Sequence, residues 1–301
     1  MEFKIFTMFQ LIDGKLVSNI IKNQIKEEID FIKSKYSKSP KLAVILVGDN
    51  PASQTYVSNK VNSCNKLGIS SLSLFFDKKV TQQELLIEIN KLNENFEVNG
   101  ILVQLPLPLH LDEFEIIKTI IPDKDVDGFH PVNVGKLWIG EENGFYPCTP
   151  YGITELINYY NIETKGKNVV IIGRSNIVGK PLAALLLRKK YNATVTICHS
   201  FTENIINFTK SADILISAVG KPHYIKKNMI KENAIIIDVG INRIECFENE
   251  KGYKLCGDVD FENVKDIVSW ITPVPGGVGP MTIAMLLKNT LTAFKKQNNI
   301  K

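Results

Sequence analysis

The sequence predicts an α/β protein with two domains. Three observations lead to this expectation: a length of 301 residues, alternating strand and helix patterns, and a glycine-rich turn within residues 167–181. In that stretch a β-branched run ends at Gly173, and an apolar helical run follows Gly179. Strand, glycine turn and helix in this order direct a helix N-terminus toward a phosphate in Rossmann-like domains. The spacing is G-x-S-x-x-x-G instead of G-x-G-x-x-G, so a turn without a ligand is the alternative.

The composition fits a folded protein and gives no support to a nucleic-acid-binding one. Hydrophobic residues make up 44% of the chain, which is sufficient for a full core. The net charge is only +4, from 36 basic and 32 acidic residues that are spread along the chain. We therefore expect no nucleic-acid partner, although this charge is compatible with a small anionic ligand.

The cysteines, the histidines and the N-terminus point to a reducing compartment. The five cysteines include no C-x-x-C pair, and the four histidines have no metal-ligand spacing. No disulfide framework and no metal site are therefore expected. The first ten residues lack the pattern of a signal or transit peptide, and no apolar run reaches the roughly 20 residues that a membrane helix needs. We expect a soluble, cytoplasmic protein with no membrane partner.

Apolar spacing in the first half of the chain predicts alternating helices and strands. The predicted helices are residues 16–32, 53–67, 81–96 and 112–121, and the predicted strands are residues 42–48, 71–76 and 100–108. Strands that are apolar throughout are typical of a parallel sheet with helices on its faces. Residues 122–137 follow, and their composition predicts a loop rich in carboxylates.

A second series of strands and helices follows a predicted hinge at residues 147–150. The expected elements are a helix at 151–160, strands at 169–172, 193–200, 212–220 and 234–240, a polar hairpin at 246–254, a strand within 269–282 and a final helix at 283–295. Gly and Pro make up three-quarters of residues 273–280, which is more than a plain turn needs. Such a backbone is typical of a loop that folds around a ligand.

Tyr56 and Lys60 are four residues apart in a predicted helix and therefore share one face. The same Tyr-x-x-x-Lys pattern occurs in short-chain dehydrogenases, where it follows the glycine turn. Here it precedes that turn by more than a hundred residues, so this interpretation fails. By spacing alone, a solvent-exposed face is the simpler explanation of the pair.

Two further polar positions lie near predicted strand ends. Gln104 interrupts an apolar strand, either as a core amide bonded to the backbone or as a ligand group at the strand's carboxyl end. Asp123, Asp125 and Asp127 begin the spacing of a calcium loop, but the distal Glu that such a loop needs is missing. A turn that supplies one functional carboxylate is the better interpretation.

The second strand of the Rossmann-like unit ends without the acidic residue that would hold the ribose hydroxyls of NAD. His199 and Ser200 stand there instead, and Arg174 lies in the glycine turn. An arginine with a nearby hydroxyl suits the ribose phosphate of NADP, because a guanidinium can bind a phosphate through two hydrogen bonds. A surface arginine and a helix-capping serine are the alternative.

Seven motifs in order along the chain resemble the bifunctional methylenetetrahydrofolate dehydrogenase/cyclohydrolase family. They are YVSNK (56–60), GILVQLPLP (100–108), DKDVDGFHPVN (123–133), PCTPYGI (147–153), GRSNIVGKP (173–181), CHS (198–200) and TPVPGGVGPMT (272–282). The resemblance covers nearly the whole chain, except the N-terminal ten residues and the polar stretch at 245–254.

The resemblance implies a fold and two activities. A folate-binding catalytic domain is expected to comprise residues 1–148 and 282–301, so that the C-terminal helix packs back on it, and a Rossmann-like NADP-binding domain residues 149–281. The implied reactions are NADP-dependent oxidation of 5,10-methylenetetrahydrofolate to the methenyl compound and hydrolysis of that compound to 10-formyltetrahydrofolate. No metal is implied, because the methenyl cation is itself electrophilic.

The resemblance also assigns roles to individual residues. Lys60 is implied as the central catalytic group, Gln104 as its hydrogen-bond partner, Tyr56 as a ring packed on the folate, and Asp127 as the ligand of the pterin. The implied cofactor-binding residues are Gly173, Arg174, Ser175, Gly179, His199, Ser200, Gly220, Ile241 and Thr282. Further implied substrate-binding residues are Leu105, Pro106, Pro275, Gly276 and Gly277.

Tetrahydrofolate derivatives are the implied partners, together with a second copy of the chain in a homodimer. Two rival hypotheses remain open: a monofunctional or NAD-preferring dehydrogenase, and a folate- or dinucleotide-binding protein without turnover. The presence of Lys60 and Gln104 argues against the loss of the cyclohydrolase activity, and Arg174 with Ser200 argues against a preference for NAD. An ATP-dependent synthetase is not expected, because the chain has no G-x-x-x-x-G-K-[ST] loop.

Overall fold

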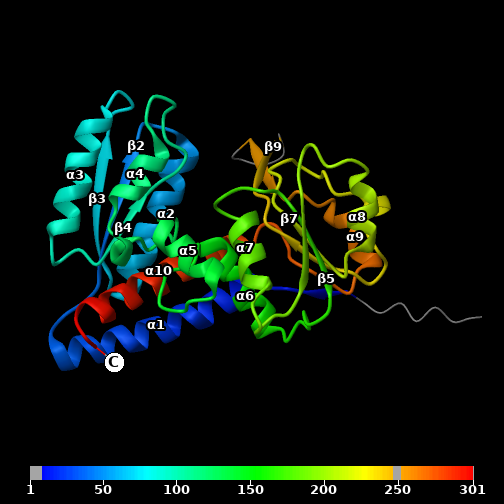
Figure 1. Cartoon of the computed structure of the whole chain (residues 1–301), viewed down its shortest axis with the longest axis horizontal. Helices are drawn as coiled ribbons and strands as arrows, with labels where there is room; N and C mark the ends of the chain where they lie inside the picture. Colours follow the sequence, from blue (N-terminus) through cyan, green and yellow to red (C-terminus); the bar gives the residue numbers. More distant parts are fainter. Residues whose placement is uncertain (1–8, 247–251, 301) are drawn as a thin grey trace, which may run out of the picture. The chain divides into compact units, whose positions relative to one another are not determined.

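The structure is a computed structural model that describes residues 9–246 and 252–300. The chain forms two compact units, which we name by their principal sheets (Figure 1). The six-stranded unit contains the described residues up to Ser18 and Thr149–Thr282, and the three-stranded unit contains Asn19–Cys148 and the C-terminal segment from Ile283. The expected α/β fold with two domains is confirmed.

The three-stranded unit is a parallel sheet in the order β3-β2-β4, with helices around it. Its strands are β2 (Lys41–Val47), β3 (Ser70–Phe76) and β4 (Gly100–Val103), and its helices are α1 (Gly14–Tyr36, which starts in the other unit), α2 (Pro51–Leu67), α3 (Gln82–Glu94), α4 (Glu113–Thr119), the 3₁₀ turn η1 (Pro122–Lys124), α5 (Pro131–Ile139) and α10 (Val278–Gln297, which also starts in the other unit). Figure 1 shows α2 and α3 on opposite sides of this sheet.

Apolar side chains on alternate positions of β2 form the core of this unit. Ala43, Ile45 and Val47 pack in one cluster with Leu85 and Ile89 of α3. Alternation places every second residue of a strand on the same face, so α3 covers the face to which these three side chains point. Local signals set the helix ends: Thr81 and Glu84 form a capping box at the start of α3, which satisfies otherwise unpaired backbone N–H groups.

The six-stranded unit is a parallel sheet in the order β1-β11-β8-β7-β5-β6. Its strands are β1 (Gln10–Leu11), β5 (Asn168–Ile172), β6 (Thr194–Cys198), β7 (Ile214–Ser217), β8 (Ile235–Asp238) and β11 (Trp270–Ile271), and its helical segments are α6 (Cys148–Tyr159), α7 (Gly179–Leu186), α8 (Ile205–Ser211), η2 (Lys227–Met229), α9 (Phe261–Val264) and η3 (Lys265–Ile267). The chain runs from β5 to β6 on one side and then to β7 on the other. This reversal makes a topological switch point, where doubly wound sheets bind ligands at the carboxyl ends of their strands.

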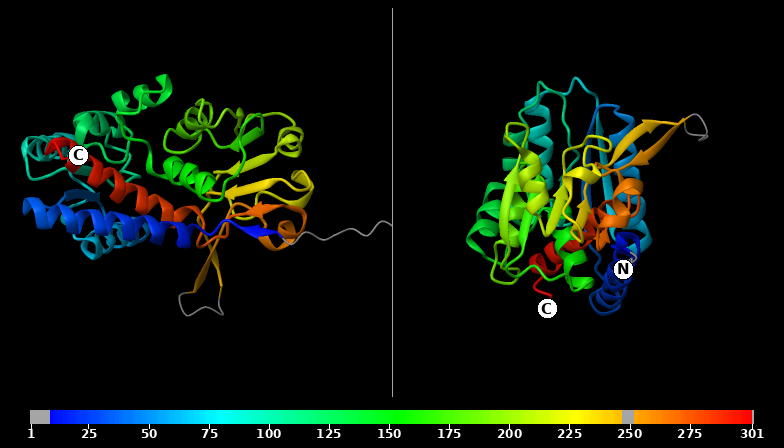
Figure 2. Two further views of the ribbon diagram at one scale, coloured as in Figure 1. Left: turned by 90° about the horizontal axis from the view of Figure 1, so that it is seen from below. Right: turned by 90° about the vertical axis from the view of Figure 1, so that its right-hand side faces the viewer.

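A two-stranded antiparallel hairpin extends away from this sheet (Figure 2). Its strands are β9 (Asn242–Glu245) and β10 (Tyr253–Cys256). The hairpin is expected at 246–254, but β9 lies before that range and β10 overlaps only its last two residues, while residues 247–251 lie outside the described part of the chain.

The compact units differ from the predicted domains at the N-terminus. The prediction placed all residues before 149 in the first domain, but residues 9–18 lie in the six-stranded unit. The reason is a backbone pairing: β1 lies parallel to β11 with Gln10 opposite Trp270, so this segment completes the edge of the six-stranded sheet. The sequence carried no signal for a two-residue strand, because so short a run shows no periodicity.

The expectation of a loop throughout 122–137 is wrong. Pro131–Ile139 forms α5, with Pro131 at its first turn and Gly140 as a left-handed C-cap. Proline in the first turn and glycine at the C-cap are both typical of helix ends. The composition of the preceding residues, with three aspartates and Gly128, predicted a loop instead. The strand predicted at 100–108 is also shorter, since β4 ends at Val103 ahead of Pro106 and Pro108.

The C-terminal helix packs on the three-stranded unit, as expected. The Asn289 amide of α10 donates hydrogen bonds to the carbonyl oxygens of Val126 (2.8 Å) and Tyr146 (3.1 Å). Among the described residues, no helix combines the length and apolarity that a transmembrane span requires.

Candidate active site

Lys60 is a buried lysine on the inward face of α2. It is 8% exposed and lies on the face that also carries Val57 and Cys64. Its Nζ donates a 3.0 Å hydrogen bond to Oε1 of Gln104, which directly follows β4. The solvent-exposed face that spacing alone suggested is therefore wrong for Lys60, although Tyr56 one turn earlier is 40% exposed.

Gln104 is hydrogen-bonded to the backbone, as expected of a core amide, and it also accepts a hydrogen bond from Lys60. Its side-chain Nε2 donates to the carbonyl of Leu105 at 2.6 Å, and its backbone N–H donates to Ile45 of β2 at 2.9 Å. These bonds hold the amide so that its oxygen points to Lys60. Pro106, which the sequence assigned to the substrate, is exposed directly beyond this pair, and the Leu105–Pro106 peptide bond is cis.

Asp127 belongs to the same cluster. Its carboxylate interacts with the charge of Lys60 and lies beside the Cys148 thiol. The loss of hydration on burial raises the pKa of Asp127, and the nearby Lys60 opposes this increase. Because the side chain is only half-buried, a ligand can reach it. The structure thus brings together Lys60, Gln104 and Asp127 from α2, the end of β4 and the turn before α5.

Asp125, two residues earlier, has a different environment. It is 1% exposed, and its carboxylate accepts hydrogen bonds from Gly128 N (3.1 Å), Phe129 N (3.2 Å), His130 N (2.8 Å) and Asn133 Nδ2 (2.8 Å). These four donors account for its acceptor capacity, so Asp125 shapes the turn that presents Asp127. The preference for Asp127 over Asp125 as the ligand-binding acid has a structural basis here.

Cys148 and Asn289 support this turn, and the sequence did not indicate either one. The Cys148 thiol donates to the carbonyl of Val126 at 3.4 Å, and the Asn289 amide donates to the same carbonyl at 2.8 Å. Burial raises the pKa of Cys148 well above its usual value, so this thiol is a neutral donor. Their positions gave no signal because their contacts join segments that are far apart in the sequence.

The glycine turn lies at the switch point of the six-stranded unit. A side-chain carbon on Gly173 would lie 2.4 Å from the carbonyl oxygen of Ala218, immediately after β7. One on Gly179 would lie 1.9 Å from the carbonyl oxygen of Gly173. Only glycine therefore allows β5, β7 and α7 to approach so closely. Because these two positions carry no side chain, the backbone at the N-terminus of α7 is uncovered there. Ser175 closes the turn by accepting a 3.1 Å hydrogen bond from Val178 N.

Arg174 and Ser200 are both exposed at this edge of the sheet. The Arg174 guanidinium lies 5.9 Å from the ring centroid of Phe201, within cation–π range. Phe201 N donates to Nδ1 of His199 at 3.2 Å, which folds the segment after β6 into a turn. This edge of the sheet fits a phosphorylated dinucleotide. It offers uncovered backbone at the glycine turn, an exposed guanidinium and a hydroxyl, and no carboxylate stands at the end of β6.

Four further predicted residues of this unit line a small apolar pocket. Its volume is about 110 Å³, and it lies between the turn after β8 and the Pro/Gly-rich segment after β11. Ile241, assigned to the cofactor, and Pro275, Gly276 and Gly277, assigned to the substrate, all line it. Gly220 lies in the loop after β7, and Thr282 is half-buried with its hydroxyl 2.9 Å from that of Thr149.

Two buried acids at the same edge were missed by the sequence analysis. Asp238 ends β8 and is 3% exposed, and Asp258 follows β10 and is fully buried. Burial raises the pKa of Asp238 to about 7, although three backbone N–H donors oppose the increase. An aspartate at the end of an apolar strand was the available signal for Asp238.

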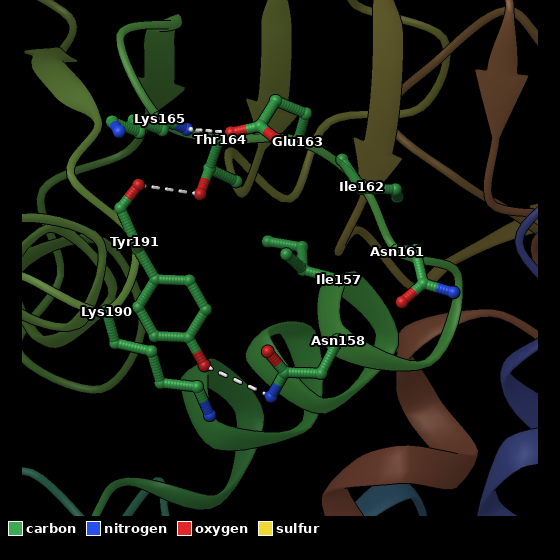
Figure 3. A pocket seen from close by; sticks show the side chains of 9 residues that line it. All are labelled: Ile157, Asn158, Asn161, Ile162, Glu163, Thr164, Lys165, Lys190 and Tyr191. Atoms are coloured by element: carbon green, nitrogen blue, oxygen red, sulfur yellow. Dashed lines mark hydrogen bonds between the residues drawn. The ribbon is translucent and has the colours of Figure 1, made fainter.

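A larger pocket of about 320 Å³ lies elsewhere in this unit and contains no predicted site residue (Figure 3). It is lined by Ile157, Asn158, Asn161, Ile162, Glu163, Thr164, Lys165, Lys190 and Tyr191. These segments precede β5 and β6, whereas parallel sheets bind ligands at the opposite, carboxyl ends of their strands. Several of its polar groups also satisfy one another, as Asn158 does by donating to the Tyr191 hydroxyl at 3.2 Å.

Within residues 9–246 and 252–300, the acidic, cysteine and histidine side chains form no group of three that could hold a metal ion. The pairs Asp125/Asp127 and Asp238/Asp258 consist of two acids each. Their neighbours are backbone N–H groups, amides, a hydroxyl, a thiol and a lysine.

Comparisons with known proteins assign both parts of the chain to one family. The model of the tetrahydrofolate dehydrogenase/cyclohydrolase catalytic domain matches residues 12–127, and the NAD(P)-binding domain of the same family matches residues 147–298. The bifunctional protein FolD of Prosthecochloris aestuarii is 53% identical over 293 residues, which cover 96% of this chain and 99% of that protein.

Solved structures of similar proteins have the same fold. The bifunctional methylenetetrahydrofolate dehydrogenase/cyclohydrolase FolD of Campylobacter jejuni is 52% identical with a TM-score of 0.91, over 96% of this chain and 99% of that one. The dehydrogenase-cyclohydrolase of Trypanosoma brucei, solved with NADP cofactor and an inhibitor, is 40% identical with a TM-score of 0.92, over 96% and 98% of the two chains.

Proposed function

Because the chain belongs to the tetrahydrofolate dehydrogenase/cyclohydrolase family, we propose that it is a bifunctional one-carbon enzyme. It oxidises 5,10-methylenetetrahydrofolate to 5,10-methenyltetrahydrofolate with NADP⁺ and hydrolyses the methenyl compound to 10-formyltetrahydrofolate. The observation that carries this proposal is the buried Lys60, hydrogen-bonded to Gln104 and close to the half-buried Asp127.

The residues of the six-stranded unit bind the dinucleotide in this proposal. Arg174 and Ser200 bind the ribose phosphate, and the bare backbone around Gly173 and Gly179 accommodates the pyrophosphate at the N-terminus of α7. Ser175, His199, Gly220, Ile241 and Thr282 complete the cofactor site. Bound NADP⁺ supplies the acceptor for the hydride that leaves the methylene bridge between N5 and N10.

The residues of the three-stranded unit act on the folate. The Asp127 carboxylate accepts two hydrogen bonds from the amino-pyrimidinone edge of the pterin, and the exposed ring of Tyr56 packs on its flat face. Lys60 takes up a proton from the water that attacks the bridge carbon and passes it to N5. The bond from that carbon to N5 then breaks, the second proton of the water leaves to solvent as the carbonyl forms, and N10 keeps the formyl group. Gln104 holds the Lys60 side chain in place. Leu105 and Pro106 contribute further folate contacts. Pro275, Gly276 and Gly277, which belong to the six-stranded unit, are also assigned to the folate.

We also propose a domain assignment, a subunit arrangement and a cellular location for the chain. The functional domains are residues 1–148 with 282–301 for folate and 149–281 for NADP, although residues 9–18 of the first lie in the six-stranded unit. The chain acts as a cytoplasmic homodimer, in which the six-stranded unit supplies the contact, and its partners are folate derivatives and not nucleic acids. Support for the dimer comes from β6, whose edge position offers unpaired backbone groups. Light scattering of the purified chain measures the subunit count.

Absorbance assays test the two reactions separately. Purified protein receives methylenetetrahydrofolate with NADP⁺ or with NAD⁺, and in a second assay methenyltetrahydrofolate alone. We expect methenyl product at far lower NADP⁺ than NAD⁺ concentration, and clearance of methenyltetrahydrofolate faster than in buffer. Lys60→Met is expected to lose this clearance by about 100-fold or more, whereas Lys66→Met, on the exposed side of α2, keeps it.

The alternatives correspond to other outcomes of the same assays. Equal use of NADP⁺ and NAD⁺ would contradict the roles of Arg174 and Ser200. Oxidation without clearance of methenyltetrahydrofolate would identify a monofunctional dehydrogenase. No reaction with either dinucleotide would leave a binding protein without turnover.

A further inference from the structure

Asp258 is a fully buried carboxylate that connects two loops at the carboxyl edge of the six-stranded sheet. One loop follows β7 and carries Gly220, and the other follows β8 and carries Ile241. Its oxygens accept hydrogen bonds from Ser217 Oγ (3.2 Å), Val219 N (2.7 Å), Gly220 N (3.2 Å), Lys221 N (3.0 Å) and Asn242 Nδ2 (3.0 Å). Three of the donors are successive backbone N–H groups of the first loop.

The second loop is fitted around the same carboxylate. A side-chain carbon on Gly240 would lie 2.1 Å from Oδ1 of Asp258, so the backbone beside Ile241 directly contacts the acid. Asp238 fixes Asp258 in turn, because its carboxylate accepts from Asp258 N at 3.0 Å and from Val259 N at 2.9 Å. Asp238 also accepts from Gly240 N at 2.9 Å.

These contacts make both loops depend on one side chain. A buried backbone N–H without an acceptor costs about 1–3 kcal/mol, so removal of the Asp258 acceptors would leave residues 219–221 to find other conformations. Among the residues that the structure describes, Asp258 takes part in no ion pair that would give it another purpose. Three of its five hydrogen bonds are with the first loop, and the other two are with Ser217 at the end of β7 and Asn242 at the start of β9, the strand residues that flank the two loops.

We propose that Asp258 is a positioning residue for the dinucleotide, holding Gly220 and Ile241 together in the conformation that binds it. This inference rests on the proposed function, which assigns those two residues to the cofactor. A preorganised loop loses less conformational freedom on binding, and the affinity for the dinucleotide therefore depends on Asp258. Lys60, Gln104 and Asp127 of the three-stranded unit do not share its contacts.

Asp258→Asn tests this role, since an amide nitrogen would face donors at one of the two oxygen positions. The test measures NADP⁺ affinity by titration, the KM for NADP⁺ and for methylenetetrahydrofolate in the dehydrogenase reaction, and the rate of methenyltetrahydrofolate hydrolysis, which consumes no dinucleotide. Asp260→Asn is the matched control, because Asp260 is two residues away and pairs with the exposed Lys226 at 3.0 Å.

We expect Asp258→Asn to weaken NADP⁺ binding and raise its KM by about tenfold, the effect of roughly 1.4 kcal/mol. The KM for the folate and the hydrolysis rate stay within twofold, and Asp260→Asn resembles the unmodified protein. Unchanged NADP⁺ affinity, or an equal loss of both activities in a folded variant, would overturn the proposal.

Asn242→Ala provides a milder variant if Asp258→Asn does not fold. It removes one donor and keeps the carboxylate, so NADP⁺ affinity falls by roughly threefold, within the usual worth of one hydrogen bond, while hydrolysis is unchanged. An unaltered affinity in Asn242→Ala would count against the proposal. Failure of the proposed function would be visible separately, as absent turnover in the unmodified protein, and the NADP⁺ titrations would still compare the variants.

Discussion

Each unit contains a pair of aspartates with buried or half-buried carboxylates, and the two pairs differ in what those carboxylates contact. In the three-stranded unit, Asp125 accepts four hydrogen bonds from its own turn, whereas Asp127 keeps some exposure beside Lys60. In the six-stranded unit, Asp238 and Asp258 are both enclosed by backbone N–H groups.

The comparison shows which property separates a ligand-binding acid from an architectural one. A raised pKa does not do so, because burial raises the pKa of Asp125, Asp127 and Asp238 alike. The two kinds of acid differ in their remaining acceptor capacity and in their exposure. A carboxylate that is saturated by backbone donors can accept no further hydrogen bond from a ligand. By this criterion Asp127 is the one of the four aspartates that keeps acceptor capacity for a ligand, as its proposed role requires, whereas the carboxylates of the other three are occupied by hydrogen bonds within the protein.

The largest effect is expected from Asp127→Asn, which tests the ligand-binding member of the comparison. Loss of the acceptor for the pterin and of the charge beside Lys60 lowers kcat/KM for the folate by about 100-fold, equivalent to roughly 2.7 kcal/mol. NADP⁺ affinity and thermal stability remain close to those of the unmodified protein. Steady-state assays measure the loss, and Asp123→Asn, an exposed acid of the same turn, is the control.

Asp125→Asn should have the opposite profile, with a loss of stability as its primary effect. One oxygen position becomes an amide nitrogen that faces two donors, which costs about 2–3 kcal/mol. Urea denaturation measures the change, again with Asp123→Asn beside it. A variant with full stability and impaired folate binding would show that the two acids of this turn had been assigned the wrong way round.

Asp238 gives a pH dependence that distinguishes the six-stranded unit. The folded protein retains the proton on this carboxyl up to a pKa of about 7, whereas the usual value is 3.8. Between these values the folded state binds more protons than the unfolded chain, so the free energy of unfolding falls as pH rises, by up to roughly 1.4 kcal/mol per pH unit.

Substitution isolates this contribution, because Asp125 and Asp127 also have raised pKa values and contribute in the same direction. In Asp238→Asn, we expect a smaller loss of stability between pH 5 and pH 8 than in the unmodified protein. Urea midpoints at the two pH values measure it. The same pH dependence in both proteins would rule out Asp238 as a source.

The smallest effect is expected from Phe201→Ala at the edge of the dinucleotide site. The ring lies within cation–π distance of Arg174, an interaction worth about 0.5–1 kcal/mol at an exposed position. Its removal frees the guanidinium and lowers the preference for NADP⁺ over NAD⁺ by roughly threefold. The ratio of the two kcat/KM values measures it, with Phe208→Ala on α8 as a control; an unchanged ratio would mean that Phe201 does not orient Arg174.

Local pattern was sufficient for much of the fold. The runs that form β2, β5 and β8 were recognisable because they are almost wholly apolar, and every side chain after the first residue of each strand is buried. The glycines at 173 and 179 marked the turn that the structure places at the switch point. The helix α5 was missed because the acidic residues before Pro131 dominate the composition of that stretch.

The sequence by itself determined the α/β class, the order of the elements apart from short ones such as β1 and α5, the family, and Lys60, Gln104 and Asp127 as candidates, because periodicity and motifs are local properties of the chain. Only the tertiary structure decided that β1 joins β11, that Lys60 is buried against Gln104, and that Asp258 collects donors from two loops. Burial and hydrogen bonding of a side chain depend on segments remote in the sequence, and these are brought together only when the sheet has formed.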